Sequence, residues 1–388
     1  MRNFFDSTLR RPLLAALLMG VAAIACLPTP AAAAMDLLDQ PAFQSGRAAK
    51  SMLLTIARAG ERLVAAGERG VIVYSDDQGT SWTQANVPVS VTLTTLCFVS
   101  RDAGWAAGHD GVILKTADGG KTWHKQFDGN SANTLVLAGL EARVKETRSA
   151  LETAPEKSRA TAAASLESLQ NSLQDAKAST SFGPSMPLFG LWFRDATEGL
   201  VIGAFGQFFH TRDGGKTWES WSGRIANPEG LHFNSIAQLA NGNLMITGEA
   251  GKLRRSRDEG VTWETLDTGY PGHLYGTLAL PDSPVLLTYG FAGNVYKSSD
   301  DGRTWKALPK LTNKPIVAGM TLPNGSILLV AGDGRVLTSR DQGGSFVLST
   351  TPSGRPVAAV LPQLLPNNKL LLVGTGGPRL VNVNINAH

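Results

Sequence analysis

One eight-residue pattern occurs six times in this chain and constrains its fold more than any other feature. The pattern is Ser or Thr, any residue, Asp, any residue, Gly, any residue, Ser or Thr, and an aromatic residue. The six copies align without gaps and are Ser75–Trp82, Thr116–Trp123, Thr211–Trp218, Ser256–Trp263, Ser298–Trp305 and Ser339–Phe346. Four of the five intervals between successive starts are 41 to 45 residues long. A repeat of this length indicates stacked supersecondary units.

Glycines precede every octet at fixed distances. The first set lies five residues before each start and comprises Gly70, Gly111, Gly206, Gly251, Gly293 and Gly334. A second glycine lies three residues earlier in five copies, and Ala331 takes that place in the sixth. This Gly-x-x-Gly spacing predicts a tight hairpin turn, because positive φ costs least at glycine. With apolar runs on both sides, each repeat supplies four strands, which is typical of a β-propeller blade.

A degraded seventh copy is visible at residues 374–377, where three glycines precede an apolar stretch but no octet follows. The 42 glycines and 8 tryptophans of the chain suit many short strands joined by tight turns. We therefore expect an all-β fold, a seven-bladed β-propeller of four-stranded blades over residues 35–388. Because a ring must close, we expect a strand from residues 36–50 to complete the last blade.

The N-terminal residues 1–34 have the features of a signal peptide. Three arginines come first, an apolar run follows at residues 13–25, and four alanines stand at residues 31–34. The apolar run is too short for a stable membrane-spanning helix. We therefore expect export to the periplasm, or to the thylakoid lumen in a phototroph. Lipidation at Cys26, which would attach the protein to a membrane, stays open as an alternative.

The interval between the second and third octets is anomalous, at 95 residues. Apolar residues recur there at helical spacing in two runs, and Pro155 separates the runs. These runs predict a helical hairpin over residues 136–178, inserted into a connection between blades. Its Leu140, Val144 and Leu151 are candidate contacts to a partner. The alternative is a lid that packs on its own propeller.

The octets invite a catalytic or calcium-binding interpretation, but six identical turns cannot all be one active site. We expect their aspartates to accept hydrogen bonds within the turn and their aromatic residues to pack on neighbouring blades. These residues are Asp77, Asp118, Asp213, Asp258, Asp300, Asp341, Trp82, Trp123, Trp218, Trp263, Trp305 and Phe346. The histidines lack metal-ligand spacing, and two cysteines cannot make a four-cysteine zinc site. We expect no catalytic residue, metal or cofactor, and a buried, inert Cys97.

Two phenylalanines stand out in the Gly-x-x-Gly turns. Alternating strands place these turns on the same face of the ring as the connections between blades. Phe205 and Phe291 occupy two of these turns. An exposed turn does not need a phenylalanine side chain, so both residues call for another explanation. They are candidate partner-binding residues. The alternative is that each ring folds back onto its own blade.

The octet resembles the Asp-box (BNR) repeat, and residues 100–123, SRDAGWAAGHDGVILKTADGGKTW, are similar to the Ycf48-like photosystem II assembly factors and their bacterial relatives. The resemblance covers about residues 40–385. We therefore expect a scaffold or assembly factor that binds membrane-protein subunits on the periplasmic or lumenal side, and we expect it to be monomeric and non-enzymatic. In a phototroph, the implied partner is a photosystem II subunit.

The same octet occurs in sialidases and other glycosidases, so an exported glycan-binding protein or glycoside hydrolase is the alternative class. Such an enzyme needs two carboxylates about 5–10 Å apart at a sugar-sized cleft. Nucleic acid is not an expected partner, because the formal net charge is only +4 and is spread along the chain.

Overall fold

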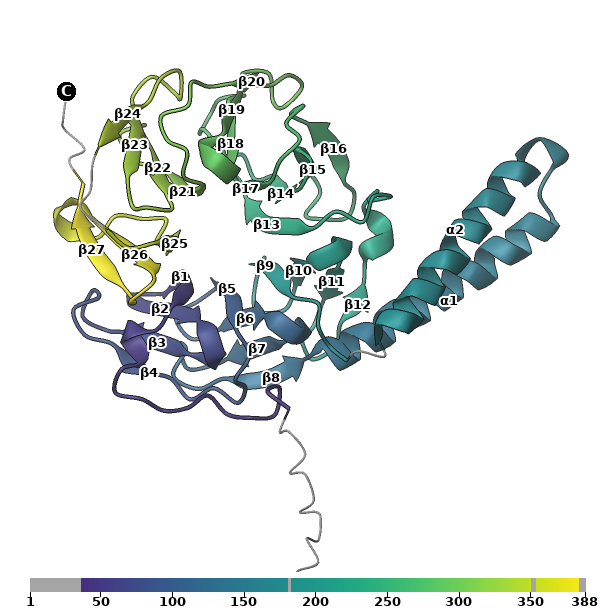
Figure 1. Ribbon diagram of the computed structural model, residues 1–388, viewed down its shortest axis with the longest axis horizontal. Helices are drawn as coiled ribbons and strands as arrows, with labels where there is room; N and C mark the ends of the chain where they lie inside the picture. The colour runs from purple at the N-terminus through teal and green to yellow at the C-terminus, as the bar shows by residue number, and fades with distance from the viewer. Residues whose placement is uncertain (1–35, 181–182, 350–353, 384–388) are drawn as a thin grey trace, which may run out of the picture. The chain divides into compact units, whose positions relative to one another are not determined.

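The computed structural model describes residues 36–180, 183–349 and 354–383. Seven antiparallel sheets surround a central opening in a closed ring, which confirms the predicted propeller (Figure 1). Within every sheet the strands pair in sequence order, and the first strand of each blade lies closest to the axis (Figure 1). Six blades have four strands each, whereas the seventh has three among the described residues.

The strands are short, as expected for blades. Blades 1 to 3 contain β1 (Leu53–Ala59), β2 (Arg62–Gly67), β3 (Ile72–Ser75), β4 (Thr83–Gln84), β5 (Leu93–Phe98), β6 (Gly104–Gly108), β7 (Ile113–Thr116), β8 (His124–Phe127), β9 (Leu188–Phe193), β10 (Gly199–Gly203), β11 (Phe208–Thr211) and β12 (Glu219–Ser220). Blades 4 to 7 contain β13 (Phe233–Gln238), β14 (Leu244–Gly248), β15 (Lys252–Ser256), β16 (Glu264–Asp267), β17 (Leu274–Ala279), β18 (Leu286–Gly290), β19 (Val295–Ser298), β20 (Lys306–Ala307), β21 (Ile316–Thr321), β22 (Ile327–Ala331), β23 (Val336–Ser339), β24 (Val347–Ser349), β25 (Val357–Val360), β26 (Lys369–Gly374) and β27 (Arg379–Asn382).

The octets form the turns between the third and fourth strands, and their hydrogen bonds are local. In the first copy, Ser75 Oγ donates to Asp77 Oδ1 at 2.8 Å, and the Gly79 N–H donates to Ser75 Oγ at 2.8 Å. The Ser81 N–H donates to Asp77 Oδ1 at 2.8 Å. The other five copies repeat this arrangement. The octet aspartates therefore hold their own turns together.

Each octet turn also packs on the preceding blade. The indole of Trp105 in blade 2 donates to the carbonyl of Gly214 in the blade 3 octet at 3.1 Å. Between blades 1 and 2, the Arg62 guanidinium donates to the carbonyl of Asp118 at 3.2 Å. The apolar core consists of such contacts between neighbouring sheets, and Trp105 stacks on Phe193 of the next blade with ring centroids 3.6 Å apart.

The expected closure of the ring by a strand from residues 36–50 is wrong. That segment contains only a short 3-10 helix, η1 (Ala48–Lys50), and it runs along blades 1 and 2, where the Ala42 N–H donates to the carbonyl of Val87 at 3.0 Å. The buried Leu38 and Ala42 direct it there, because they belong to the apolar cluster shared by those two blades. The ring closes instead by packing of β1 on β25 and β26, around a core that includes Leu53 and Leu371.

The long insertion forms two helices, α1 (Gly129–Glu152) and α2 (Glu156–Thr180), between β8 and β9 (Figure 1). They extend beyond the expected 136–178 at both ends. The early start of α1 has two causes: Asp128 caps the helix by accepting from the Ser131 N–H, and the first turns of α1 pack on the propeller. Ala132 is buried in the core shared by blades 2 and 3. Within the described residues, no helix has the length and apolar character needed to cross a membrane.

Candidate functional site

Four of the Gly-x-x-Gly turns fold as short 3-10 turns in which the middle residue and the closing glycine both lie in the left-handed region. They are η2 (Glu68–Gly70), η3 (His109–Gly111), η4 (Ala204–Gly206) and η6 (Phe291–Gly293). In η4 the left-handed residue before the glycine is Phe205, with φ of 54°. A phenylalanine rarely adopts this conformation, and it costs on the order of 1–3 kcal/mol. The turn therefore holds Phe205 in a position that the side chain alone would not favour.

Phe205 does not fold back onto its own blade. Its side chain is 62% exposed, and its ring meets the imidazole of His232 edge-on, with centroids 4.5 Å apart. His232 belongs to blade 4, directly before β13. The backbone N–H of Phe205 donates to His232 Nδ1 at 2.9 Å, so that nitrogen must be unprotonated to accept the bond. The exposed ring and the adjacent histidine are thus fixed together across a blade boundary.

Glu249 joins this pair to the next blade. It follows β14 in the Gly-x-x-Gly turn of blade 4, and its Oε2 accepts from the backbone N–H of His232 at 2.8 Å. Its Oε1 lies 3.5 Å from Nδ1 of His273, which directly precedes β17. The ring of Phe291 lies beside His273, with centroids 6.4 Å apart, and the Phe291 side chain is 52% exposed.

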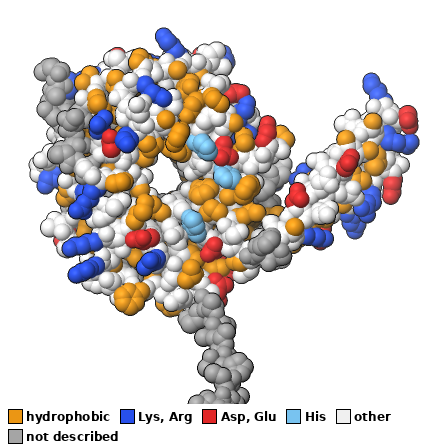
Figure 2. All heavy atoms as spheres, in the orientation of Figure 1, with side chains coloured by type: hydrophobic (Ala, Val, Ile, Leu, Met, Phe, Trp, Pro, Cys, Tyr) orange, Lys and Arg blue, Asp and Glu red, His pale blue; other side chains and the backbone are white. Residues whose placement is uncertain are grey.

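Five residues from three blades therefore form one surface, which we call the aromatic–histidine patch: Phe205, His232, Glu249, His273 and Phe291. Figure 2 shows histidine and apolar side chains beside the central opening of the ring. Across the described ranges, no cluster of three or more His, Cys, Asp or Glu side chains is suited to a metal ion. The arrangement offers two apolar anchors next to hydrogen-bonding groups, which suits recognition of a peptide segment.

Sequence reasoning found the two phenylalanines but missed His232, Glu249 and His273. A signal was available, because each histidine lies one residue before the first strand of its blade. Equivalent positions in successive repeats face the same side of a ring. Comparison of the repeats by position, rather than a search for metal-ligand spacing, would have put both histidines beside the turns.

The candidate residues of the hairpin lie elsewhere. Val144 is buried, and Leu140 and Leu151 are partly buried. The strongly exposed large apolar residues of the described chain include none from α1 or α2. The two helices pack on each other, so the apolar stripe is used largely within the hairpin.

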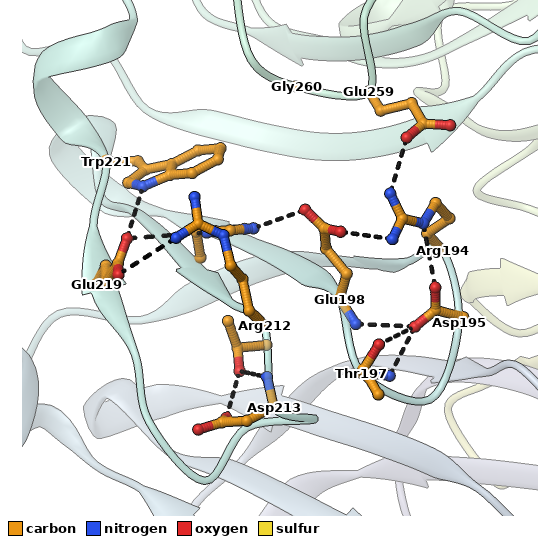
Figure 3. A network of polar contacts seen from close by, with 12 residues as sticks. Arg194, Asp195, Thr197, Glu198, Arg212, Asp213, Glu219, Trp221, Glu259 and Gly260 are labelled. Carbon is orange, nitrogen blue, oxygen red and sulfur yellow. Dashed lines mark hydrogen bonds and ion pairs between the residues drawn. The ribbon is translucent and has the colours of Figure 1, made fainter.

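A second polar network links blades 3 and 4 away from the patch (Figure 3). His210 is buried and stacks on Trp221 with centroids 3.7 Å apart, and its Nε2 lies 3.1 Å from Glu198 Oε1. Burial lowers the pKa of His210. Glu198 pairs in turn with Arg194, whose guanidinium donates to Glu259 in the blade 4 octet at 2.9 Å. This network fastens one blade to the next.

The thiol of Cys97 has no role in any of these sites. It is partly buried against the core shared by blades 2 and 3, and loss of hydration there raises its pKa to about 11. A thiolate, the reactive form, is therefore rare at neutral pH.

A hollow with a volume of about 930 Å³ lies at the opposite ends of the first strands, in blades 4 to 7. The described residues that line it include no aspartate or glutamate. Glycoside hydrolysis with paired carboxylates requires two such groups at the cleft. This hollow therefore lacks the feature that would favour the glycosidase alternative.

The fold and its repeated turns define a seven-bladed β-propeller. The family described as photosynthesis system II assembly factor YCF48 matches residues 74–146 and 184–347, which is more than half of the chain. The chain belongs to this family, as the resemblance of the octets predicted.

Solved structures show the same fold at low sequence identity. The structure described as "YCF48 bound to D1 peptide" is 15% identical and has a TM-score of 0.60, covering 89% of this chain and 99% of the other. YCF48 from Cyanidioschyzon merolae is 12% identical with a TM-score of 0.57, covering 85% and 95%. The WD40 propeller domain of Doa1 is 10% identical with a TM-score of 0.52, covering 88% and 94%.

A curated protein also matches over a short segment. Vacuolar protein sorting/targeting protein 10 of Komagataella phaffii (strain GS115 / ATCC 20864) is 29% identical over 109 residues. The match covers 28% of this chain and spans 7% of that protein.

Proposed function

We propose that this protein is an exported, non-enzymatic assembly factor that binds a segment of a membrane-protein partner through the aromatic–histidine patch. The observation that carries the proposal is the pair of exposed phenylalanines, Phe205 and Phe291, held on one face by backbone turns and by a His–Glu–His arrangement. Membership of a family of assembly factors supports a binding role rather than a reaction.

The chemistry of the patch suits a peptide ligand. Large aromatic side chains contribute most of the binding energy at protein interfaces when they enter pockets of the partner. Around them, Glu249 is an acceptor, and the histidines offer ring nitrogens to the N–H and C=O groups of an extended segment. A partner segment with small apolar side chains flanked by polar residues would complement this surface.

The class of partner follows from the family. One structural neighbour is YCF48 with a D1 peptide bound. By analogy, the partner in a phototrophic host is a photosystem II subunit, and in another host it is a subunit of a different membrane complex. The propeller acts as a monomer on the periplasmic or lumenal side in this proposal.

Site-specific photo-crosslinking tests the proposed surface. A photoreactive amino acid at position 205 or 291, expressed in the native host, is expected to crosslink to a membrane-protein subunit that mass spectrometry identifies. Position 43 is the matched control, because Phe43 is also exposed, at 84%, but lies outside the patch. Crosslinking of the same subunit from position 43 at equal yield, or none from 205 and 291, would refute the proposal.

Export requires a separate test. N-terminal sequencing of the protein from the periplasmic or lumenal fraction is expected to begin near Met35. An intact N-terminus starting at residue 1 in the cytoplasmic fraction would contradict export, while leaving the binding surface to be judged by the crosslinks.

A further inference from the structure

The hollow on the other face of the propeller has the size of a small-molecule site. Its volume of about 930 Å³ falls within the 300–1,000 Å³ usual for ligand pockets. It is lined by the ends of the first strands and the following turns in blades 4 to 7, together with Gln342 of the blade 6 octet. We call it the uncharged basin. Because it lies at the opposite ends of the strands from the aromatic–histidine patch, it is separate from the proposed partner site.

The chemistry of its lining is unusual for this protein. The chain contains 36 Lys and Arg and 32 Asp and Glu residues, yet none of those in the described ranges lines the basin. No Phe, Tyr, Trp or His lines it either. Its apolar surface comes from aliphatic residues such as Leu278, Met320 and Leu364, and from prolines at the turns. The polar groups are uncharged Gln, Thr and Ser side chains, including Gln342 and Gln363.

This lining selects against several ligand classes. An ionised group inside the basin would lose hydration without an opposite charge to replace it, which is costly. Sugars and nucleobases usually stack on aromatic rings, which the lining lacks. A folded protein domain needs an interface of about 1,200–2,000 Å² in total, more than a hollow of this size provides by itself. A flexible aliphatic chain needs none of these groups and gains from contact with leucine, methionine and proline.

We propose that the uncharged basin binds the aliphatic chain of a lipid-like molecule. The chain would lie against Leu278, Met320 and Leu364, and the polar end of the molecule would remain in solvent. No covalent step is involved.

A homologous series of neutral alcohols tests the proposal. Displacement of the uncharged fluorophore N-phenyl-1-naphthylamine from the purified protein is measured with 1-octanol, 1-decanol and 1-dodecanol. Each buried methylene contributes about 0.8 kcal/mol, so affinity should rise about fourfold per carbon until the basin is filled. Absence of displacement, or an affinity independent of chain length, would overturn the proposal.

A matched pair of variants locates the site. Gln342→Glu places a charge in the basin, and Gln174→Glu makes the same change at an exposed position of α2, outside the lining. Position 342 tolerates glutamate, because Gln342 is exposed and Glu259 occupies the equivalent octet position in blade 4 with a similar positive φ. Gln342→Glu should weaken alcohol binding at least tenfold, and Gln174→Glu should leave it unchanged. Gln363→Glu is a second basin variant, at an exposed turn position.

The remaining outcomes test whether the alcohol binds elsewhere and whether a peptide or a membrane surface is the ligand instead. Equal affinities in Gln342→Glu, Gln363→Glu and the parent protein would place the alcohol elsewhere and refute the site. Displacement of the fluorophore by a blocked, uncharged Leu/Pro peptide at lower concentration than by 1-dodecanol would assign the basin to a peptide instead. Co-sedimentation with phosphatidylcholine vesicles that 1-dodecanol does not reduce would indicate adsorption to a membrane surface, and would also overturn the proposal.

Discussion

The indole of Trp218 is buried in the blade 3 octet turn, and its Nε1 has no hydrogen-bond partner among the described residues. In the equivalent turn of blade 2, Trp123 is buried to a similar degree, and its Nε1 donates to the carbonyl of Gly120 at 3.1 Å. The corresponding carbonyl in blade 3 is that of Gly215, against which the side-chain amide of Gln126 lies at 3.3 Å. Comparison of the variants Trp123→Phe and Trp218→Phe therefore separates the contribution of the indole hydrogen bond to stability from that of packing.

The expected difference between the two variants follows from these contacts. Both substitutions remove similar apolar surface, and Phe346 at this position in blade 6 indicates that the turn accepts phenylalanine. Trp123→Phe also removes a hydrogen bond worth about 1 kcal/mol. Trp218→Phe instead removes a buried donor without a partner, which relieves a penalty of about 1–3 kcal/mol. Trp218→Phe should thus be less destabilising than Trp123→Phe by about 2–4 kcal/mol.

Urea unfolding followed by circular dichroism measures this difference in the free energy of unfolding. The slope of the free energy against urea concentration should stay the same in both variants, since the change is local. A finding that Trp218→Phe is as destabilising as Trp123→Phe, or more so, would refute the account of the unpaired indole.

Three further outcomes are expected. The hydroxyls and backbone N–H groups of Ser81 and Thr304 donate hydrogen bonds to Asp77 and Asp300, and lower the pKa of each carboxyl group to about 2. The two aspartates therefore stabilise the fold above about pH 4, and this contribution is lost as the pH falls toward 2. Acid titration of the unfolding midpoint should show this loss, and a flat profile between about pH 4 and 2 would contradict it. Cys97 should resist alkylation at pH 8 in the folded protein and react after denaturation, as mass spectrometry of the labelled peptide would reveal; rapid native labelling would contradict the raised pKa of the thiol. Replacement of residues 138–180 by a short Gly/Ser linker should leave the propeller folded by circular dichroism, because loop-closure entropy grows slowly with length; a collapsed fold would show that the hairpin is part of the core.

The blades could be predicted from the sequence because their signals are local. The octet hydrogen bonds of Ser75, Asp77 and Gly79 join residues no more than four positions apart. Such a turn depends on neighbouring residues alone, so the six octets indicated the kind of blade and six of the blades, and the glycines at residues 374–377 indicated the seventh. Pro155 and the helical spacing around it likewise sufficed for the two helices of the insertion.

The ring closure could not be predicted in the same way. An open strand edge suggested a partner strand from residues 36–50, but that segment forms no strand, and no backbone hydrogen bond between described residues joins the first and last blades. The apolar faces of β1 and of the last blade meet around Leu53 and Leu371, and side-chain packing between sheets carries no pattern in the local sequence. Packing of Leu38 in the apolar cluster of blades 1 and 2 likewise places the N-terminal segment there.

The sequence by itself determined the repeated turns, the propeller class and the presence of Phe205 and Phe291 on the face with the connections between blades. Only the tertiary structure decided which residues surround them. Glu249 lies 17 residues from His232 and 24 from His273, and the three meet because blades 4 and 5 are neighbours in the ring. The uncharged basin likewise exists only where four blades converge. Sites built between repeats depend on the angle and spacing of the blades, which arise from the packing of whole sheets rather than from any single turn.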